Sequence, residues 1–366
     1  MKLKIEKQTM INGLQNIQTI VSQRSSIPIL SNVMLETCGD SLKITANSMD
    51  VSVQTIVNAK ISKEGKTTID GKRLFSIFRE MSGVEIDMMV DDNYQTTLRS
   101  AASQFKLNGM SCEEFPRMPE IESDKNYSIN QGVFKEMLQK TSYAASLDET
   151  RMALNGVLLS FKEGKLVVVA TDGRRLALVE QEVEFPASME MDIIIPPKTV
   201  NELMRTLESQ GEGMLKITAE EKKVSFKFSN ILIVSKLIDD KFPDYAQVIP
   251  ESSEERVTIE REVLLAAIRR VALLTTEQSN SVKLCFTKNN IEIVTETPEI
   301  GEAKENVAIK YDGANVSIAF NPEFLIAPLK SIQSDEIYFE MTDEMNPGVI
   351  KTDVPFLYVI MPMRIT

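Results

Sequence analysis

One short stretch holds side chains that could act as a catalytic acid and an anion clamp. In Val168–Glu180, VVATDGRRLALVE, the residues Asp172 and Gly173 precede Arg174 and Arg175 between two apolar runs. An aspartate beside two guanidinium groups could transfer a proton or bind a phosphate. However, Asp-Gly between apolar runs is also the signal for a tight type I′ hairpin. We therefore predict that Asp172 is a turn residue and not an acid catalyst, which leaves the arginine pair unexplained.

The remaining composition excludes several classes of chemistry. There is no histidine, so Ser-His-Asp and Cys-His pairs and imidazole metal ligands are absent. Neither GxxxxGK[ST] nor GxGxxG occurs, so the two commonest nucleotide-binding loops are missing. The three cysteines, Cys38, Cys112 and Cys285, form no CxxC and are odd in number. We expect them to be small core residues, and we expect no cofactor or metal.

An enzyme remains one alternative, because adjacent carboxylates can hold a metal ion. The pairs Asp91-Asp92, Asp148-Glu149 and Asp239-Asp240 could serve a metal-dependent phosphoesterase. Acidic pairs at strand ends are more often solvated turns, and nothing in the sequence indicates that these three converge. Metal-dependent hydrolysis that disappeared on their mutation would support this alternative.

Length and composition limit the architecture and the location. The chain has 366 residues, enough for two or three domains, and 43% are hydrophobic. No apolar run has membrane length, and the first ten residues resemble no signal peptide, so we expect a cytoplasmic protein. The net charge of −12 alone disfavours a nucleic-acid partner.

The elements that must position these residues repeat three times. A strand followed by a helix begins near Ile5, Ile129 and Ile259, and a second one near Ile69, Ile195 and Phe320. Both landmarks recur after roughly 125 residues, the length of a small domain. We predict an α+β fold of three similar domains, each with two helices on one side of an antiparallel sheet. The boundaries are 1–122, 127–249 and 255–366, with Pro-containing acidic joints between them.

The expected helices are basic although the protein is acidic. The segments 8–24, 71–81, 131–145, 197–208, 261–274 and 321–333 together hold 12 basic and 6 acidic residues, whereas the remainder holds 29 basic and 47 acidic. Solvated helices favour Glu as much as Lys or Arg, so the scarcity of Glu is unusual. This separation of charge favours a polar, mildly basic surface that contacts phosphates without reading bases.

The carboxyl end is unusually apolar. The chain finishes FLYVIMPMRIT, which predicts a last core strand. Methionines beside a proline could also form an adaptable apolar groove for peptides.

These residues together resemble a known family. ATDGRRLA, RMALNG, SKLIDDKFPDY, RSSIPILSN and the terminal VIMPMR are similar to motifs of the bacterial DNA polymerase III beta subunits, the replicative sliding clamps, and the similarity spans the whole chain. The resemblance implies a head-to-tail homodimer, a closed ring with helices lining the hole and sheets outside. Such a ring encircles duplex DNA, tethers the polymerase, has no catalytic centre and is opened by a separate ATPase loader.

The resemblance also assigns residues to sites. A peptide pocket for the polymerase, the loader, and repair polymerases and ligase is implied at Arg151, Leu154, Thr171, Gly173, Arg174, Arg175, Leu176, Pro243, Val248, Phe324, Val359, Met361, Pro362, Met363 and Arg364. Phe105, Leu107, Leu273 and Leu274 match the dimer contact. Arg24 and Lys198 match DNA-facing positions, and the helix charges add Lys72, Arg73, Arg205, Arg269 and Arg270.

Two departures concern the pocket. Other members have a histidine where Arg174 stands, and frequently a tyrosine where Phe324 stands, so this chain's peptide preference is open. A second alternative also stays open, namely a repeat-built adaptor that binds peptides and never DNA. Neutralising the helix arginines separates the two, because only a clamp would lose retention on DNA.

Overall fold

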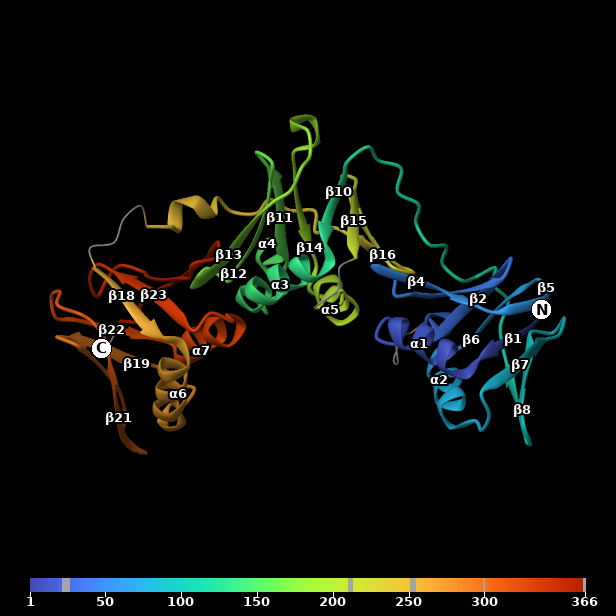
Figure 1. Ribbon diagram of the computed structural model, residues 1–366, viewed down its shortest axis with the longest axis horizontal. Coiled ribbons are helices and arrows are strands. Elements are labelled where there is room, and N and C mark those ends of the chain that lie inside the picture. Colours follow the sequence, from blue (N-terminus) through green and yellow to red (C-terminus); the bar gives the residue numbers. More distant parts are fainter. Residues whose placement is uncertain (22–26, 210–212, 251–254, 299, 365–366) are drawn as a thin grey trace. The chain divides into compact units, whose positions relative to one another are not determined.

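The computed structural model describes residues 1–21, 27–209, 213–250, 255–298 and 300–364 (Figure 1). Each repeat contains a strand that runs directly into a helix, then further strands, a second helix and three final strands. This order confirms the repeat predicted from the sequence. The first copy consists of β1 (Lys2–Glu6), α1 (Lys7–Ile17), β2 (Asn32–Cys38), β3 (Ser41–Asn47), β4 (Val51–Asn58), β5 (Lys60–Lys63), β6 (Lys66–Asp70), α2 (Gly71–Glu80), β7 (Glu85–Val90), β8 (Gln95–Ser100) and β9 (Ser103–Asn108).

The second and third copies follow the same order, with one short extra helix. The second consists of β10 (Asn126–Asn130), α3 (Gln131–Thr141), α4 (Met152–Asn155), β11 (Val157–Lys162), β12 (Lys165–Thr171), β13 (Arg175–Glu182), β14 (Met191–Ile195), α5 (Pro197–Thr206), β15 (Met214–Ala219), β16 (Lys223–Phe228) and β17 (Ile231–Lys236). The third consists of β18 (Glu255–Glu260), α6 (Arg261–Val271), β19 (Val282–Thr287), β20 (Asn290–Thr297), β21 (Gly301–Ala308), β22 (Val316–Phe320), α7 (Pro322–Ser331), β23 (Glu336–Met341), β24 (Gly348–Lys351) and β25 (Phe356–Ile360).

The strands form four antiparallel sheets within the described part of the chain. One compact unit, residues 1–134 and 201–237, contains the sheets β5-β1-β7-β8-β9 and β10-β15-β16-β17-β4-β3-β2-β6. The other unit, residues 135–200 and 238–366, contains β14-β11-β12-β13-β25-β24-β23-β18 and β21-β20-β19-β22. Each eight-stranded sheet therefore joins strands of two neighbouring repeats, through β17 on β4 and through β13 on β25.

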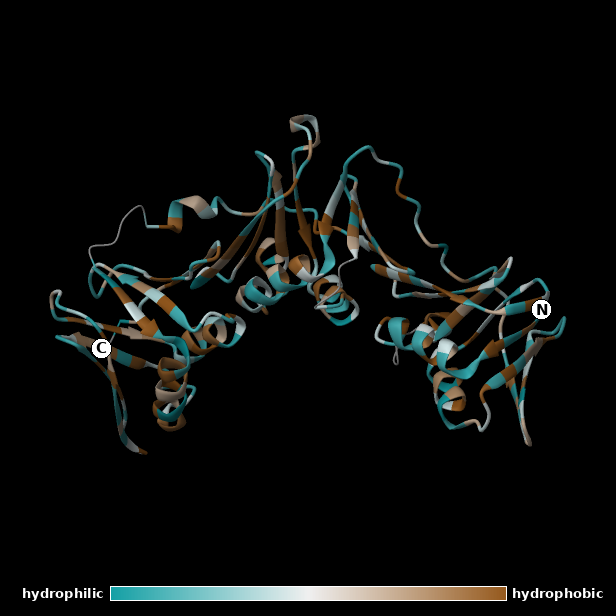
Figure 2. Ribbon diagram, viewed as in Figure 1, coloured by the Kyte–Doolittle hydropathy of each residue, from teal (hydrophilic) through white to brown (hydrophobic). Residues whose placement is uncertain are grey.

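Burial patterns explain which faces pack. Strand β7 alternates exposed and buried residues, as expected for a sheet with one face in the core. Strand β11 is buried from Val157 to Phe161, since it carries apolar side chains on both faces. In Figure 2 hydrophobic residues accordingly follow β11 along its length. Helices α6 and α7 pack on each other, as do α1 and α2.

Two expectations about local structure were wrong. The first helix was predicted over 8–24, but it ends at Ile17 and is followed by a turn in which the Ile20 N–H donates to the Ile17 carbonyl. Burial of Ile20 and Val21 then redirects the chain into the core. The cysteines are not all core residues, because Cys38 is exposed at the end of β2, where Gly39 turns the chain with a positive φ. Cys112 and Cys285 are half-buried.

Candidate functional site: a hairpin and a C-terminal segment around an apolar hollow

The loop between β12 and β13 is longer than a type I′ turn. Strand β12 ends at Thr171 and β13 begins at Arg175, so the loop spans 172–174. Of its first two residues only Gly173 has a positive φ. The prediction of a type I′ turn was therefore wrong. The Asp172 carboxylate instead accepts hydrogen bonds from the N–H groups of Arg174 (2.8 Å) and Arg175 (3.1 Å). This side chain organises the loop, as predicted for a turn residue.

The arginines around this loop have different partners. Arg151, at the start of α4, donates from Nη1 to the Asp172 carbonyl at 2.8 Å. Arg175 Nε donates to Asp172 Oδ2 at 3.1 Å, and its guanidinium carbon lies 4.3 Å from the centre of the Phe324 ring. That distance is typical of a cation–π contact. Arg174 is exposed. Thus Arg151 and Arg175 fix the hairpin, whereas Arg174 points its charge at solvent.

The backbone of Phe324 is held by a buried tyrosine. The Tyr358 hydroxyl donates to the Phe324 carbonyl at 2.7 Å, and burial raises the pKa of Tyr358 well above its ordinary value. Burial also raises the pKa of Tyr143, whose ring lies beside that of Tyr358. Both phenols therefore remain neutral at physiological pH.

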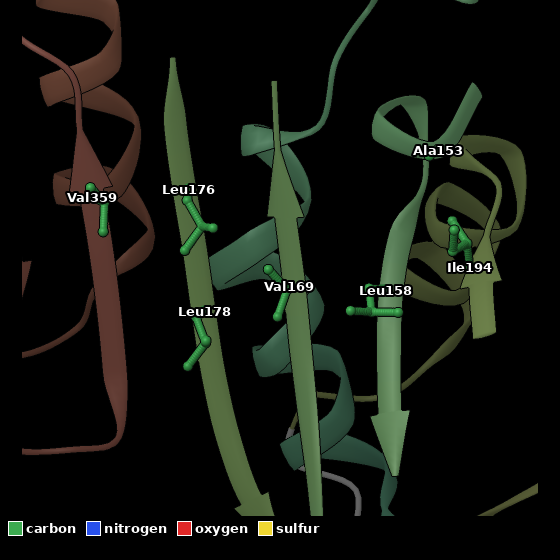
Figure 3. Packing of buried hydrophobic residues seen from close by; sticks show 7 residues of the cluster. All are labelled: Ala153, Leu158, Val169, Leu176, Leu178, Ile194 and Val359. Atoms are coloured by element: carbon green, nitrogen blue, oxygen red, sulfur yellow. The ribbon is translucent and has the colours of Figure 1, made fainter. Parts of the chain in front are cut away.

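A buried apolar cluster forms the floor beside the hairpin (Figure 3). Leu176 on β13 and Val359 on β25 face each other in register and belong to it. The other buried members are Ala153, Leu158, Val169, Leu178 and Ile194. Half-buried Phe242, Tyr245 and Ile249 pack against the cluster, so the segment carrying Pro243 and exposed Val248 lies along its edge. The seven buried side chains are at most 9% exposed, so the cluster supports the hairpin as packed core and the half-buried residues form its accessible edge.

The C-terminal segment joins this floor to a second sheet. The Met361 N–H donates to the Arg174 carbonyl at 2.9 Å, and the Met363 N–H donates to the Ala319 carbonyl on β22 at 2.7 Å. Beside it lies a hollow of about 710 Å³, lined by Lys283, Ser317, Ala319, Glu344, Met345, Met361, Pro362, Met363 and Arg364. Met345, Met361 and Met363 are 59%, 43% and 39% exposed, so adaptable thioether side chains border the hollow.

The predicted pocket residues thus gather around two neighbouring features of one compact unit. Arg151, Leu154, Thr171, Pro243 and Val248 surround the apolar floor, and the terminal residues border the hollow. Sequence reasoning missed Lys283, Ser317, Ala319, Glu344 and Met345, which line the hollow from separate strands and turns. The one available signal was Met345, a methionine within the turn-forming stretch TDEMNPG.

The predicted DNA-facing cations lie on helices but differ in their contacts. Lys72 and Arg73 on α2, Lys198 on α5 and Arg269 on α6 are exposed, and none forms an ion pair within the described residues. Arg270 is engaged by Glu305 of β21 at 2.7 and 2.9 Å. Arg205 pairs with Glu202 of the same helix. Arg24 lies outside the described residues.

Two of the residues predicted for a dimer contact lie on an edge strand, and two lie in a turn after α6. Phe105 and Leu107 are on β9, the edge strand of a five-stranded sheet, and Phe105 is 39% exposed. Leu273 and Leu274 follow α6 in a short 3-10 turn that contacts β21, the edge strand of a four-stranded sheet. Leu273 is 79% exposed.

Among the described residues, no group of three or more Cys, Asp or Glu side chains could hold a metal ion. The acidic pairs considered for an enzyme include Asp148, which accepts hydrogen bonds from Thr150 that hold its pKa below the ordinary value. No helix within the described ranges is long and apolar enough to cross a membrane.

Three repeats of paired helices on antiparallel sheets define this chain as a three-domain DNA clamp fold of the α+β class. Solved structures support this class over the full length. The chain superimposes on the sliding clamp of Pseudomonas aeruginosa bound to griselimycin with a TM-score of 0.96 at 30% identity, and on that of Bacillus subtilis with 0.96 at 29%. Each comparison covers 100% of both chains.

The sequence comparisons identify the family. Models of the DNA polymerase III beta subunit match residues 1–119 (N-terminal domain), 128–244 (central domain) and 246–364 (C-terminal domain). The beta sliding clamp of Chlamydia muridarum is 34% identical over 100% of this chain and 99% of its own length. The chain belongs to the DNA polymerase III beta subunit family, the bacterial sliding clamps, which are non-catalytic processivity factors of DNA replication. This confirms the resemblance seen in the sequence.

Proposed function

We propose that two copies of this chain close head to tail into a ring around duplex DNA, and that the ring tethers the replicative polymerase in the cytoplasm. The family membership supports this role over the full length of the chain. The three domains would span 1–122, 127–249 and 255–366. Loading would require a separate ATPase, because circular DNA can enter a closed ring only after the ring is opened.

The proposed DNA contacts are electrostatic. Exposed Lys72, Arg73, Lys198 and Arg269 lie on helices of an otherwise acidic protein. Cations of this kind contact phosphates without reading sequence, and their binding weakens as salt rises. Arg24 and Arg270 are further candidates. The acidic remainder of the surface would repel DNA, which favours a single orientation of the duplex.

The proposed peptide site comprises the apolar floor and the methionine-bordered hollow. Leu176 and Val359 belong to the packed core that supports this site, and Met361 and Met363 offer an exposed, adaptable apolar surface. Short apolar motifs of the polymerase, the loader, and repair polymerases and ligase would bind there. Arg174 would meet carbonyl or acidic groups of the peptide, because its guanidinium is exposed at the rim.

The observation that carries the proposal is the full-length match to sliding clamps together with the exposed cations on helices α2, α5 and α6 of an acidic protein. The decisive test is topological. The protein is loaded onto a nicked plasmid with a cognate loader and ATP, half the sample is cut once, and both halves are passed over a sizing column. We expect retention on circles and loss from cut DNA. Equal retention on both, or none on either, would favour the peptide-binding adaptor.

A further inference from the structure

Helix α1 ends without a cation of its own. It finishes at Ile17, and its last turn contains no basic residue. The last carbonyls of any helix lack intrahelical partners and carry the negative end of its dipole. In α1 these include the carbonyls of Gln15 and Asn16. Water or a donor from elsewhere in the chain can satisfy them.

Arg205 of α5, in the next repeat, supplies that partner. Its Nη1 donates to the Gln15 carbonyl at 2.8 Å, and its Nη2 donates to the Asn16 carbonyl. Arg205 belongs to the same compact unit as α1. The guanidinium thus binds two successive carbonyls with two nitrogens, a geometry that the planar fork of arginine allows and a lysine cannot reproduce.

Glu202 completes the contact from the same face of α5. Its side chain is 3% exposed, it pairs with Arg205, and it accepts a hydrogen bond from the Thr19 hydroxyl in the turn after α1. A carboxylate this deeply buried requires a partner charge, and removing the partner would leave it uncompensated. Glu202 and Arg205 are therefore bound to each other. Arg205 also binds the last turn of α1, and Glu202 binds the turn that follows it.

We propose that Arg205 and Glu202 are positioning residues that fix the end of α1 against α5, and that Arg205 makes no phosphate contact. This revises the sequence-based expectation that Arg205 faces DNA. The positioning role is independent of the proposed clamp function, whereas the statement about phosphate contact rests on it. The pair would thus fix the turn after α1 through Thr19.

Lys198 provides a matched control, because it lies on the same helix, is exposed and has no ion pair within the described residues. Arg205→Ala and Lys198→Ala remove the same charge from α5. Only the first would disturb α1. Arg205→Lys keeps the charge but loses the fork, and Glu202→Gln keeps the shape but loses the charge that balances Arg205.

The first measurement is hydrogen exchange of the DNA-free full-length protein over residues 14–21. We expect Arg205→Ala to accelerate exchange there about tenfold or more, since hydrogen bonds to charged groups are the strongest in the network. Arg205→Lys and Glu202→Gln should accelerate it as well, whereas Lys198→Ala should not. Exchange unchanged in Arg205→Ala would overturn the proposal.

The second measurement is duplex binding by fluorescence anisotropy over a series of salt concentrations. Each lost phosphate contact lowers the slope of log K against log salt by about 0.9. The proposal expects an unchanged slope for Arg205→Ala and a lower one for Lys198→Ala. A fall of this size in Arg205→Ala, restored by Arg205→Lys, would overturn it. An unchanged slope in Lys198→Ala would instead count against the proposed helix–DNA contact, while the exchange data still decide the positioning role.

Discussion

At the residue scale, Gly173 illustrates how one backbone conformation controls a site. Its φ is +85°, and a Cβ at this position would lie 3.0 Å from Arg151 Nη2. We predict that Gly173→Ala lowers stability by about 1 kcal/mol, because L-residues with a side chain disfavour this φ. It should also displace Arg151 and weaken binding of a short apolar clamp-binding peptide severalfold, as measured by fluorescence anisotropy.

Gly164 allows the two effects to be separated. It also has a positive φ, +72°, but an added Cβ would meet no atom within 4 Å. Gly164→Ala should therefore lose similar stability in thermal unfolding while its peptide affinity stays unchanged. Equal peptide affinity in the two variants would show that the approach of Gly173 to Arg151 is irrelevant to binding.

Tyr358 gives a residue-scale prediction about pH. Burial raises its pKa above the usual value near 10, so the folded state keeps a proton that the unfolded state releases. This contribution to stability is complete below pH 10 and is lost as the pH rises from there toward the folded-state pKa. Tyr127, raised to about 12, acts in the same direction.

We therefore predict that Tyr358→Phe has two opposite effects on the free energy of unfolding. At pH 7 it should cost about 1 kcal/mol, because the Phe324 carbonyl loses its donor. Above pH 10 the stability of the variant should fall less steeply than that of the wild-type chain. Denaturant unfolding at pH 7, 9 and 11 measures both. Parallel pH profiles would contradict the assigned burial of the phenol.

At the scale of elements, α6 presents two adjacent arginines that differ in their availability for binding phosphate. Glu305 of β21 binds Arg270 through both carboxylate oxygens, and the hydrogen bonds from Arg270 hold the pKa of Glu305 below its ordinary value. Arg269 forms no ion pair within the described residues. We predict that Arg269→Ala lowers the salt slope of duplex binding by about 0.9, while Arg270→Ala lowers it less.

Glu305→Gln tests the cause of that difference. The variant frees Arg270, so it should strengthen duplex binding, and a second substitution of Arg270→Ala should then have a larger effect than in the wild-type background. Anisotropy titrations from low to moderate salt suffice. If both arginines contribute equally before and after the change, the Glu305 pair does not control availability.

The sequence predicted elements better than their partners. The apolar stripes of α2 and α5 and the recurring strand-helix units were sufficient for the repeat, since periodicity is a local signal. The sequence did not predict that β13 pairs with β25, or that Arg205 binds carbonyls of α1, because these contacts join residues far apart in the chain. The hairpin shows a local failure. Asp-Gly favours a two-residue turn, but the Asp172 carboxylate stabilises a longer loop by accepting from Arg174 and Arg175.

At the scale of the whole molecule, two of the sheet edges among the described residues are the ones that the proposed dimer would use. β9 is the edge of a sheet in one compact unit, and β21 is the edge of a sheet in the other. Edge strands with unpaired backbone groups bind another strand readily, and two different edges that pair head to tail produce a closed ring. Phe105 places an exposed apolar side chain on β9, and Leu273 places one in the turn that contacts β21.

We predict that Leu273→Asp and Phe105→Asp each weaken the dimer at least about 100-fold, because a charge buried at an apolar contact is left without a partner. Sedimentation velocity at nanomolar to micromolar concentrations measures this, and retention on circular DNA should fall in parallel. Leu147→Asp is the control, since Leu147 is 96% exposed yet lies on no sheet edge. Leu147→Asp should leave both the dimer affinity and the retention on circular DNA unchanged. A dimer of unchanged affinity in both edge variants would mean that the ring closes through other surfaces.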